Sequence, residues 1–500
     1  MPQRKYKPLL NRHAAQLLPA RVEDYVSQTN IIRGIDVYID TLDLEQLGFT
    51  NTGLASPAGQ PSYDPSALIK LYLYGYQQGI RSSRKLEREC QRNLEVMWLT
   101  SGICPSYKTI ANFRKDNVKA LTQVHNDFIV VCKELSLIGN GLAVIDGSFF
   151  EADASTSSIY TQPQLETYLA SIDKKIKDYQ DTLNQQDKQE DQATTALPVE
   201  VEGLAEKLAL LKQKQAEKAR LLEQVKSREG NQISTVDPDA RLLKKRGKTL
   251  AGYNVQISVE SEHHLMVATD VTQDGNDSQQ LGPMMDKTQS VLESDTLVGL
   301  ADSGYYNSEH IQYCEESGYD IYVAEPDQGQ AMEKKGLHPK KAFIYHEESD
   351  CYQCPEGKAL RPGNLISIGK GKKGFYYVSK TEDCNNCPQK AKCLSKNATR
   401  KRLTRWEHQE VIDRLRKKLQ DSPDIMKKRS SVVEHPFGTV KFRAGMHHFL
   451  MRGLKKCRGE FDLMALAYNF TRVLNIIGLN KLRDYCAQRT ENGQLTDEMA

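Results

Sequence analysis

The sequence predicts an α/β protein with a mixed β-sheet at its centre, a helical N-terminal domain and two insertions. Apolar residues recur at helical spacing through residues 64–135, and strand-like runs rich in β-branched residues follow at 141–155 and 252–272. Helices and strands then alternate up to residue 326. With 500 residues, of which 39% are hydrophobic and 27% charged, the chain is long enough for several globular domains.

The N-terminal helical domain is assigned to residues 1–135. Residues 1–60 form an arm, and a helix is predicted from Asp64 to Gly79 because Asp64 is a good cap and Pro65 suits a first helical turn. Two basic helices follow, over 82–99 and from 105 onward. They predict a helix-turn-helix-like DNA-binding unit, although amphipathic helices with solvated charges have the same pattern. The candidate DNA contacts are Arg84, Lys85 and Arg114.

The catalytic core is assigned to residues 136–159 and 231–334. Three strands come first, and helices over 277–293 and 308–318 are each followed by a strand, so the element order is βββαβαβ. Successive antiparallel strands followed by alternating helices and parallel strands are typical of the ribonuclease-H-like fold. The C-terminal helical part of this core covers residues 401–485, and residues 486–500 are a tail.

The first insertion, residues 160–230, is predicted to be an antiparallel helical hairpin. Residues 165–183 and 201–227 carry heptad-like apolar spacing among many Lys, Glu and Gln residues, as in a coiled coil. The polar tract 184–200 between them contains Pro198 and is expected to form the exposed tip. A role in dimerisation is one option for this hairpin.

The second insertion, residues 335–400, contains five of the 11 cysteines. A Cys-x₂-Cys pair is followed, after 29 residues, by a second such pair, which is the spacing of the two knuckles of a zinc ribbon. A fifth thiol lies close by and is able to replace any of the four. We expect four of the five to hold one structural Zn²⁺, with redox-active or free thiols as the alternative. The five are Cys351, Cys354, Cys384, Cys387 and Cys393.

Three acidic residues are candidates for catalysis. Asp146 follows the apolar run AVI and Asp302 follows LVGLA, and a carboxylate in such a place is costly to bury unless it binds something. The alternative is an aspartate that caps a turn at the end of a strand. Glu434 is followed after six residues by Lys441, which corresponds to two helical turns, although a proline and a glycine between them count against a helix.

Several stretches together resemble the DDE transposases of bacterial insertion sequences, in the branch with a Tyr-Arg-Glu-Lys signature around the third acid. The resemblance covers most of the chain and implies that Asp146, Asp302 and Glu434 hold two Mg²⁺ or Mn²⁺ ions, with Lys441 as the signature lysine. The Tyr and Arg registers depart from the signature, because they fall on Lys427 and Ser430, with Arg429 one residue early. The matching stretches are YDPSALIKLYLYGY, PSYKTIANFR, VIDGSFFEADAS, DPDARLLKKRGKTLAGYNVQISVE, LADSGYYN, the cysteine-rich insertion and VEHPFGTVKFRAG.

The chemistry expected from this resemblance is DNA strand cleavage followed by strand transfer. Mg²⁺ prefers oxygen ligands, and two ions bind the entering and leaving oxygens of a phosphodiester. Two other functions remain open: a DNA-binding regulator derived from an inactive transposase, and a ribonuclease-H-like nuclease that cuts without joining.

The expected partner is double-stranded DNA, both the terminal repeats of the element and the target. Residues 400–460 hold 17 Lys and Arg against 7 Asp and Glu, which suits a polyanion. Bringing two DNA ends together implies a homodimer or a larger assembly. The candidate phosphate contacts, for which a solvated basic helix is the alternative, are Lys427, Lys428, Arg429, Lys441 and Arg443.

The sequence also predicts a cytoplasmic protein without a membrane partner. The N-terminal residues MPQRKYKPLL lack the apolar core of a signal peptide. The apolar stretch 461–479 contains Asp462, Asn469 and Arg472, so a buried helix suits it better than a membrane span.

Overall fold

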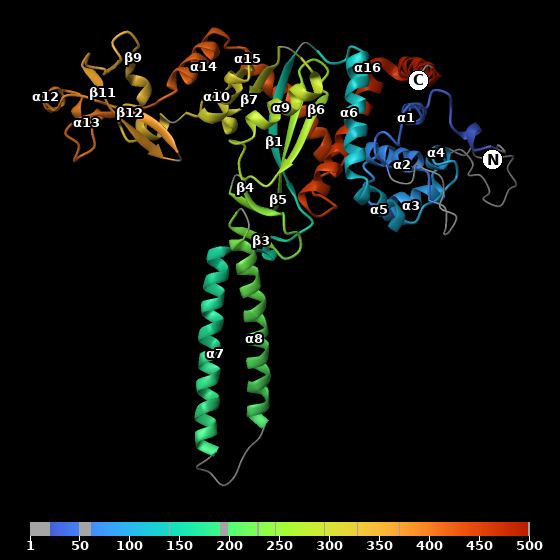
Figure 1. Ribbon diagram of the computed structural model, residues 1–500, viewed down its shortest axis with the longest axis horizontal. Coiled ribbons are helices and arrows are strands. Elements are labelled where there is room, and N and C mark those ends of the chain that lie inside the picture. The colour runs from blue at the N-terminus through green and yellow to red at the C-terminus, as the bar shows by residue number, and fades with distance from the viewer. Residues whose placement is uncertain are drawn as a thin grey trace, which may run out of the picture. The chain divides into compact units, whose positions relative to one another are not determined.

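The computed structural model describes residues 21–49, 62–139, 141–190, 199–227, 230–245, 247–294, 296–327, 329–369 and 371–498. The chain divides into two compact units, which are described separately. Unit 1 comprises Met1–Leu137, Phe150–Tyr253 and Phe437–Ala500, and unit 2 comprises Ile138–Phe149 and Asn254–Pro436. Figure 1 labels the elements.

Most of the helices belong to unit 1. The predicted helix start is confirmed, because the Asp64 side chain accepts a hydrogen bond from the Ser66 amide and Pro65 is the first helical residue. The single helix predicted over 82–99 is two helices, since the extended backbone at Asn93 ends one and its side chain caps the next. The described helices at the N-terminal end are α1 (Ile32–Ile39), α2 (Pro65–Gln77), α3 (Ser83–Arg92), α4 (Leu94–Leu99), α5 (Tyr107–Asp116) and α6 (Val118–Glu134), preceded by a short 3₁₀ turn, Val22–Tyr25.

The core of these helices forms around α16 (Leu454–Glu498), which packs against α1, α2 and α6. The rings of Tyr38 and Phe128 lie 4.9 Å apart, and Phe470 of α16 lies 5.3 Å from Phe128. The helix is interrupted at Gly478, whose φ of 77° is in the left-handed region that glycine tolerates. The apolar stretch 461–479 is thus largely buried, as predicted, and none of the helices described has an apolar run long enough to cross a membrane.

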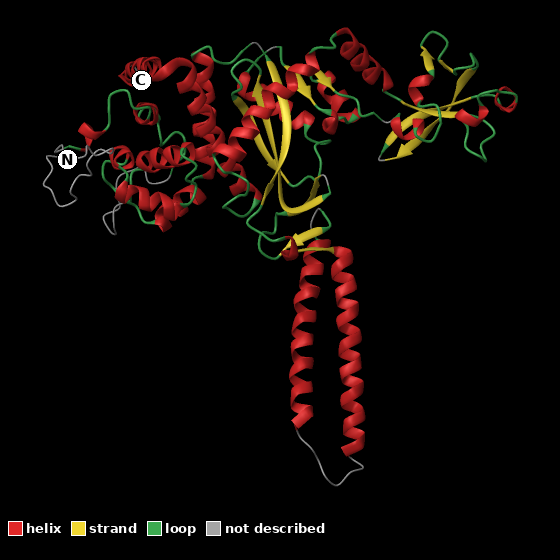
Figure 2. Ribbon diagram, turned by 180° about the vertical axis from the view of Figure 1, so that it is seen from behind, coloured by secondary structure: helices red, strands yellow, loops and turns green. Residues whose placement is uncertain are grey.

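Residues 160–230 contain the two predicted helices, α7 (Gln162–Glu190) and α8 (Val199–Lys226), which run side by side (Figures 1 and 2). Strands β2 (Ile159–Thr161) and β3 (Gln232–Ser234) pair antiparallel at their base. The predicted polar tip was placed too early, because α7 continues to Glu190. Gln, Lys and Glu are good helix formers, so their polarity does not end a helix. Residues 191–198 of the tip lie outside the described residues.

The central sheet has the order β4-β5-β1-β7-β8, with β6 paired to β5. Strands β1, β7 and β8 are parallel, while β5 pairs antiparallel with β4 and β6. With α9 (Leu281–Leu292) and α10 (Ser308–Glu316), the predicted order βββαβαβ is confirmed, and β4 is an additional strand. The strands are β1 (Leu142–Glu151), β4 (Arg241–Lys245), β5 (Lys248–Glu260), β6 (Met266–Thr272), β7 (Val298–Ala301) and β8 (Asp320–Val323).

The cysteine-rich part of unit 2 folds around a second sheet of order β13-β12-β11-β10-β9, antiparallel throughout. Its own core is small, with Phe343, Tyr352, Leu360, Tyr377 and Leu403 buried together. Its elements are α11 (Gln330–Glu333), β9 (Ile344–His346), β10 (Cys351–Gln353), β11 (Ala359–Gly369), β12 (Lys372–Val378), α12 (Thr381–Asn385), α13 (Lys390–Cys393) and β13 (Arg402–Trp406). Helices α14 (Gln409–Asp421) and α15 (Ile425–Gly438) follow, and a π-helical turn, Thr439–Arg443, lies near the start of the last segment of unit 1.

Candidate active site

Two of the three predicted acids lie on neighbouring strands of unit 2. Val144 of β1 pairs with Leu300 of β7 in parallel register, and Asp146 and Asp302 each come two residues later. Parallel neighbours keep the same register along their length, so the two carboxylates reach the same level of the sheet. The expectation that neighbouring strands bring them together is met.

The Asp146 carboxyl is in an environment that resists ionisation. Burial raises its pKa to about 6, and the charges of Asp302 and Asp277 act in the same direction. Arg429, whose Nη1 lies 3.6 Å from Asp146 Oδ1, and the Gly147 amide oppose the shift. Three carboxylates facing one another with a single arginine leave negative charge that a cation would neutralise.

Asp277 belongs to this group of carboxylates, although the sequence analysis did not identify it. Its Oδ1 accepts hydrogen bonds from Asn254 Nδ2 and Gln256 Nε2, both at 2.7 Å. Both amides are fully buried on β5, and Gln256 Oε1 in turn accepts from the buried Tyr305 hydroxyl. The available signal was indirect: Asn254 and Gln256 are polar residues that alternate with the apolar Tyr253, Val255 and Ile257 of β5.

Glycines beside the two aspartates make room for this arrangement. A Cβ atom at Gly147 would lie 2.5 Å from both Asp277 Oδ1 and Gln256 Nε2, and one at Gly304 would lie 2.9 Å from Asp302 Oδ1. The Gly304 amide donates to Asp302 Oδ1 at 2.8 Å, so Asp302 also caps the 3₁₀ turn Ser303–Tyr305. The turn-capping alternative is therefore realised in Asp302, together with its place beside Asp146.

Helix α15 carries both Arg429 and the third predicted acid, Glu434. Arg429 was expected to contact DNA, but its largely buried guanidinium is engaged with Asp146. Glu434 is exposed. Five residues correspond to a rotation of about 140° around an α-helix, so the two side chains point in different directions. Glu434 as a partner of the two aspartates remains a prediction.

The basic residues around α15 differ in their contacts. Lys427 and Lys428 are exposed, and Lys427 pairs with Asp424 at 2.7 Å. In unit 1, Lys441 Nζ lies 4.4 Å from the centre of the Phe150 ring, and Arg443 is exposed. Residues 439–443 form a π-helical turn, so the seven residues from Glu434 to Lys441 are not two regular α-helical turns, and the alignment of Lys441 with Glu434 stays a prediction.

The predicted DNA contacts of the N-terminal helices separate into exposed and buried residues. Arg84 and Lys85 are exposed on α3, with the Arg84 guanidinium 5.1 Å from the Tyr107 ring centre. Arg114 is only 5% exposed and donates to the Tyr76 hydroxyl at 2.8 Å. Its prediction as a DNA contact is corrected, because its charge is used inside the unit.

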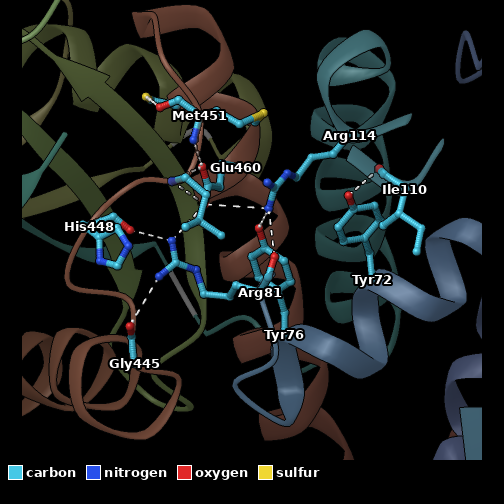
Figure 3. A network of polar contacts seen from close by, with 11 residues as sticks. Tyr72, Tyr76, Arg81, Ile110, Arg114, Gly445, His448, Met451 and Glu460 are labelled. Carbon is cyan, nitrogen blue, oxygen red and sulfur yellow. Dashed lines mark hydrogen bonds and ion pairs between the residues drawn. The ribbon is translucent and has the colours of Figure 1, made fainter. Parts of the chain in front are cut away.

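The charge that draws Arg114 inward is the fully buried Glu460 of α16 (Figure 3). Arg81 donates to Glu460 Oε1 at 2.9 Å, and the Leu450 and Met451 amides donate to the same carboxylate. Arg81 also donates to the Gly445 and His448 carbonyls. A buried carboxylate needs such partners, and sequence spacing does not reveal a pair this distant in the chain.

The positive excess predicted for residues 400–460 is partly neutralised in unit 2. Helix α14 packs on α10 and β8, and three of its cations pair with acids of neighbouring segments. These pairs are Arg414–Glu315, Arg416–Glu325 and Lys418–Asp320, and Arg405 of β13 pairs with Asp413 of α14. Composition alone therefore overstates the charge that this helix offers to DNA.

All five cysteines of the insertion are free and half-buried. As the side chains stand, no three His, Cys, Asp or Glu residues within the described ranges are placed so that they hold a metal ion. The zinc prediction stays a prediction. The same finding covers the carboxylates around Asp146, whose oxygen donors and like charge are nevertheless of the kind that a divalent cation prefers.

Two family models match parts of the chain. Residues 353–474 match the family described as "Transposase DDE domain", and residues 20–116 match "Transposase domain (DUF772)". No curated protein matches the chain. A cryo-EM structure of the piggyBac transposase synaptic complex with hairpin DNA is similar at a TM-score of 0.31 and 8% identity, covering 94% of this chain and 82% of that chain.

The DDE match includes Glu434, and the second match includes the exposed Arg84 and Lys85. Asp146 and Asp302 lie outside both matched ranges, so their assignment depends on the sheet geometry described above. Since residues 353–474 carry a transposase DDE domain, the chain is a DNA transposase, an enzyme of metal-dependent phosphoryl transfer on DNA.

Proposed function

We propose that this transposase binds the terminal repeats of an insertion sequence, cleaves the DNA there and joins the ends to a target. Asp146, Asp302 and Glu434 are the proposed catalytic acids, and two Mg²⁺ or Mn²⁺ ions are the proposed cofactor. The observation that supports this site best is the register of β1 and β7, which puts Asp146 beside Asp302, where burial, together with the charges of Asp302 and Asp277, raises the pKa of Asp146 to about 6.

Divalent ions bound at these acids would activate the attacking water or 3′-hydroxyl and stabilise the departing oxygen. The chain's own residues prepare the site. Asn254 and Gln256 hold Asp277 so that it faces the two aspartates, and Tyr305 holds Gln256. Arg429 neutralises Asp146 in the absence of metal and is available for a phosphate once the carboxylates bind cations.

The proposed partner is double-stranded DNA, held as a pair of ends by a homodimer or larger assembly. Exposed cations on several elements support phosphate contacts, which position DNA without reading its sequence. The candidates are Arg84, Lys85, Lys428 and Arg443, with Lys427 and Lys441 as partly engaged members. We further propose one structural Zn²⁺ held by four of the five cysteines in the insertion.

The deciding experiment incubates the full chain with labelled DNA from the ends of its own element, Mg²⁺ and a target plasmid. Cleavage followed by joining is the expected result. Cleavage without joining would indicate a nuclease, and binding alone would indicate a regulator. Asp146→Ala is the matched control, because it removes a proposed metal ligand while leaving the exposed Arg84 and Lys85 for binding DNA.

A further inference from the structure

The five thiols of the insertion do not lie in equivalent surroundings. We infer that Cys354, Cys384, Cys387 and Cys393 form a four-thiolate site for one structural Zn²⁺, and that Cys351 stands outside it. This inference rests on the zinc part of the proposed function and does not depend on the reaction with DNA.

Cys354 begins a tight turn that wraps around its own sulfur. The Lys358 amide donates to Cys354 Sγ at 3.3 Å, and Cys354 and Lys358 also pair through their backbones. Gly357, with a φ of 75°, supplies the left-handed residue that closes the turn. Amide donors directed at a sulfur stabilise the thiolate, which is the form that binds a metal.

The other three thiols follow one another on α12, the next turn and α13. The Cys387 amide approaches the Cys384 carbonyl at 3.4 Å, and the Lys390 amide donates to the Cys387 carbonyl as α13 begins. Cys393 then ends α13 and packs, like Cys354, against the core of Tyr352 and its neighbours. Cys354, the first thiol of the set, and Cys393, the last, therefore contact the same core.

Lys401 connects the two ends of this group. Its Nζ donates to the Cys393 carbonyl at 3.1 Å, and its amide donates to Ser379 Oγ at 2.9 Å. Ser379 Oγ lies 3.0 Å from Cys384 Sγ. Four thiolates around Zn²⁺ carry a net negative charge, which a lysine beside the site offsets.

The contacts on the page bring three of the four thiols to one place. Cys354 and Cys393 pack against the same small core, and Lys401 and Ser379 connect Cys393 to Cys384. As they stand, the side chains of the described cysteines do not form a closed ligand set, so zinc binding would require these side chains to rearrange.

Cys351 lies on the opposite face of the sheet from this group, because successive side chains of a β-strand point to opposite faces. Tyr352 of β10 points into the small core, so Cys351, its neighbour, points to the opposite face of the sheet, whereas Cys354 contacts the core. Cys351 is paired in register with His346, and its sulfur lies 3.2 Å from Ser349 Oγ. Among the two residues of the first Cys-x₂-Cys pair, only Cys354 thus faces the other thiols.

The test measures bound zinc in the purified full chain and in five single Cys→Ser variants. We expect about one zinc per chain in the unaltered protein and in Cys351→Ser, and its loss in each of the other four. Zinc lost from Cys351→Ser, zinc retained in Cys393→Ser, or no zinc in the unaltered protein would overturn the inference.

A second measurement does not depend on the folding of any variant. The unaltered, zinc-loaded chain is treated with an alkylating reagent, and labelled cysteines are identified by mass spectrometry. Cys351 and the exposed Cys104 are expected to react, with the other four protected until a chelator is added. Protection of Cys351 together with rapid labelling of Cys393 would contradict the site. DNA joining is assayed separately, so failure of the proposed function is distinguishable from failure of this site.

Discussion

Two regions of this transposase bury charged side chains, and they do so in opposite ways. In unit 1, Glu460 has two arginines and two backbone amides around it, so each charge has a partner. In unit 2, Asp146 faces two further carboxylates and only one arginine. Buried charges with matched partners are accommodated within the fold as long as every partner is present, whereas buried charge of one sign favours the binding of a cation.

The largest expected effect is on catalysis. Asp146→Ala, Asp302→Ala and Glu434→Ala are each expected to reduce DNA cleavage by roughly 10³-fold or more, because each removes a proposed metal ligand. Cleavage of labelled element ends measures the effect, and a DNA-binding assay checks that binding is kept. A variant with normal cleavage would remove its residue from the site.

Around Glu460 in unit 1, we expect removal of the buried carboxylate to lower the stability of the fold without acting directly on the reaction. Glu460→Ala leaves Arg81 and Arg114 without their carboxylate and is expected to lower the free energy of unfolding by about 3–5 kcal/mol. Denaturant unfolding measures this loss. Arg84→Ala is the matched control, because Arg84 is exposed and its removal should change stability little. If both variants lose the same free energy of unfolding, the partners of Glu460 do not make it more important to stability than an exposed residue.

Around Asp146 in unit 2, we expect removal of the buried charge to raise the free energy of unfolding, whereas around Glu460 it lowers it. The pKa of Asp146 is raised from an ordinary value of 3.8 to about 6, so the folded protein binds more protons than the unfolded chain between these values. Stability therefore falls as pH rises through that window. Without divalent metal, Asp146→Asn is expected to raise the free energy of unfolding by roughly 1–3 kcal/mol at pH 7.

The gain from Asp146→Asn should vanish near pH 4, where the aspartate is protonated in the folded state. Unfolding midpoints recorded with a chelator between pH 4 and pH 8 measure this dependence. A gain that is independent of pH would show that the charge of Asp146 is not its cause.

A smaller effect is expected for Asp277→Asn. Asp277 adds negative charge beside Asp146, and its loss should reduce cleavage about 10–100-fold, as for residues that support metal ligands. The exposed Asp274 in the same loop provides the control variant, Asp274→Asn. If the two variants cleave equally well, Asp277 serves only to hold Asn254 and Gln256.

Local sequence determined the start of α2 at Asp64 and the order of strands and helices. These follow from capping chemistry and from the period of apolar residues, both of which act over short distances or simple repeats. The two helices of residues 160–230 were predictable for the same reason. That Asp146 and Asp302 each follow an apolar strand was also readable from the sequence, but the pairing of β1 with β7 that makes them neighbours is long-range.

Only the tertiary structure decided how distant charges meet. Arg114 is buried because Glu460, far along the chain, lies against it, and Arg429 turns to Asp146 rather than outward. Asp277 joins the carboxylates because two amides of β5 hold it there, and β4 is a strand because β5 pairs with it. A charged side chain takes the partner that folding brings near, and no local pattern contains that partner.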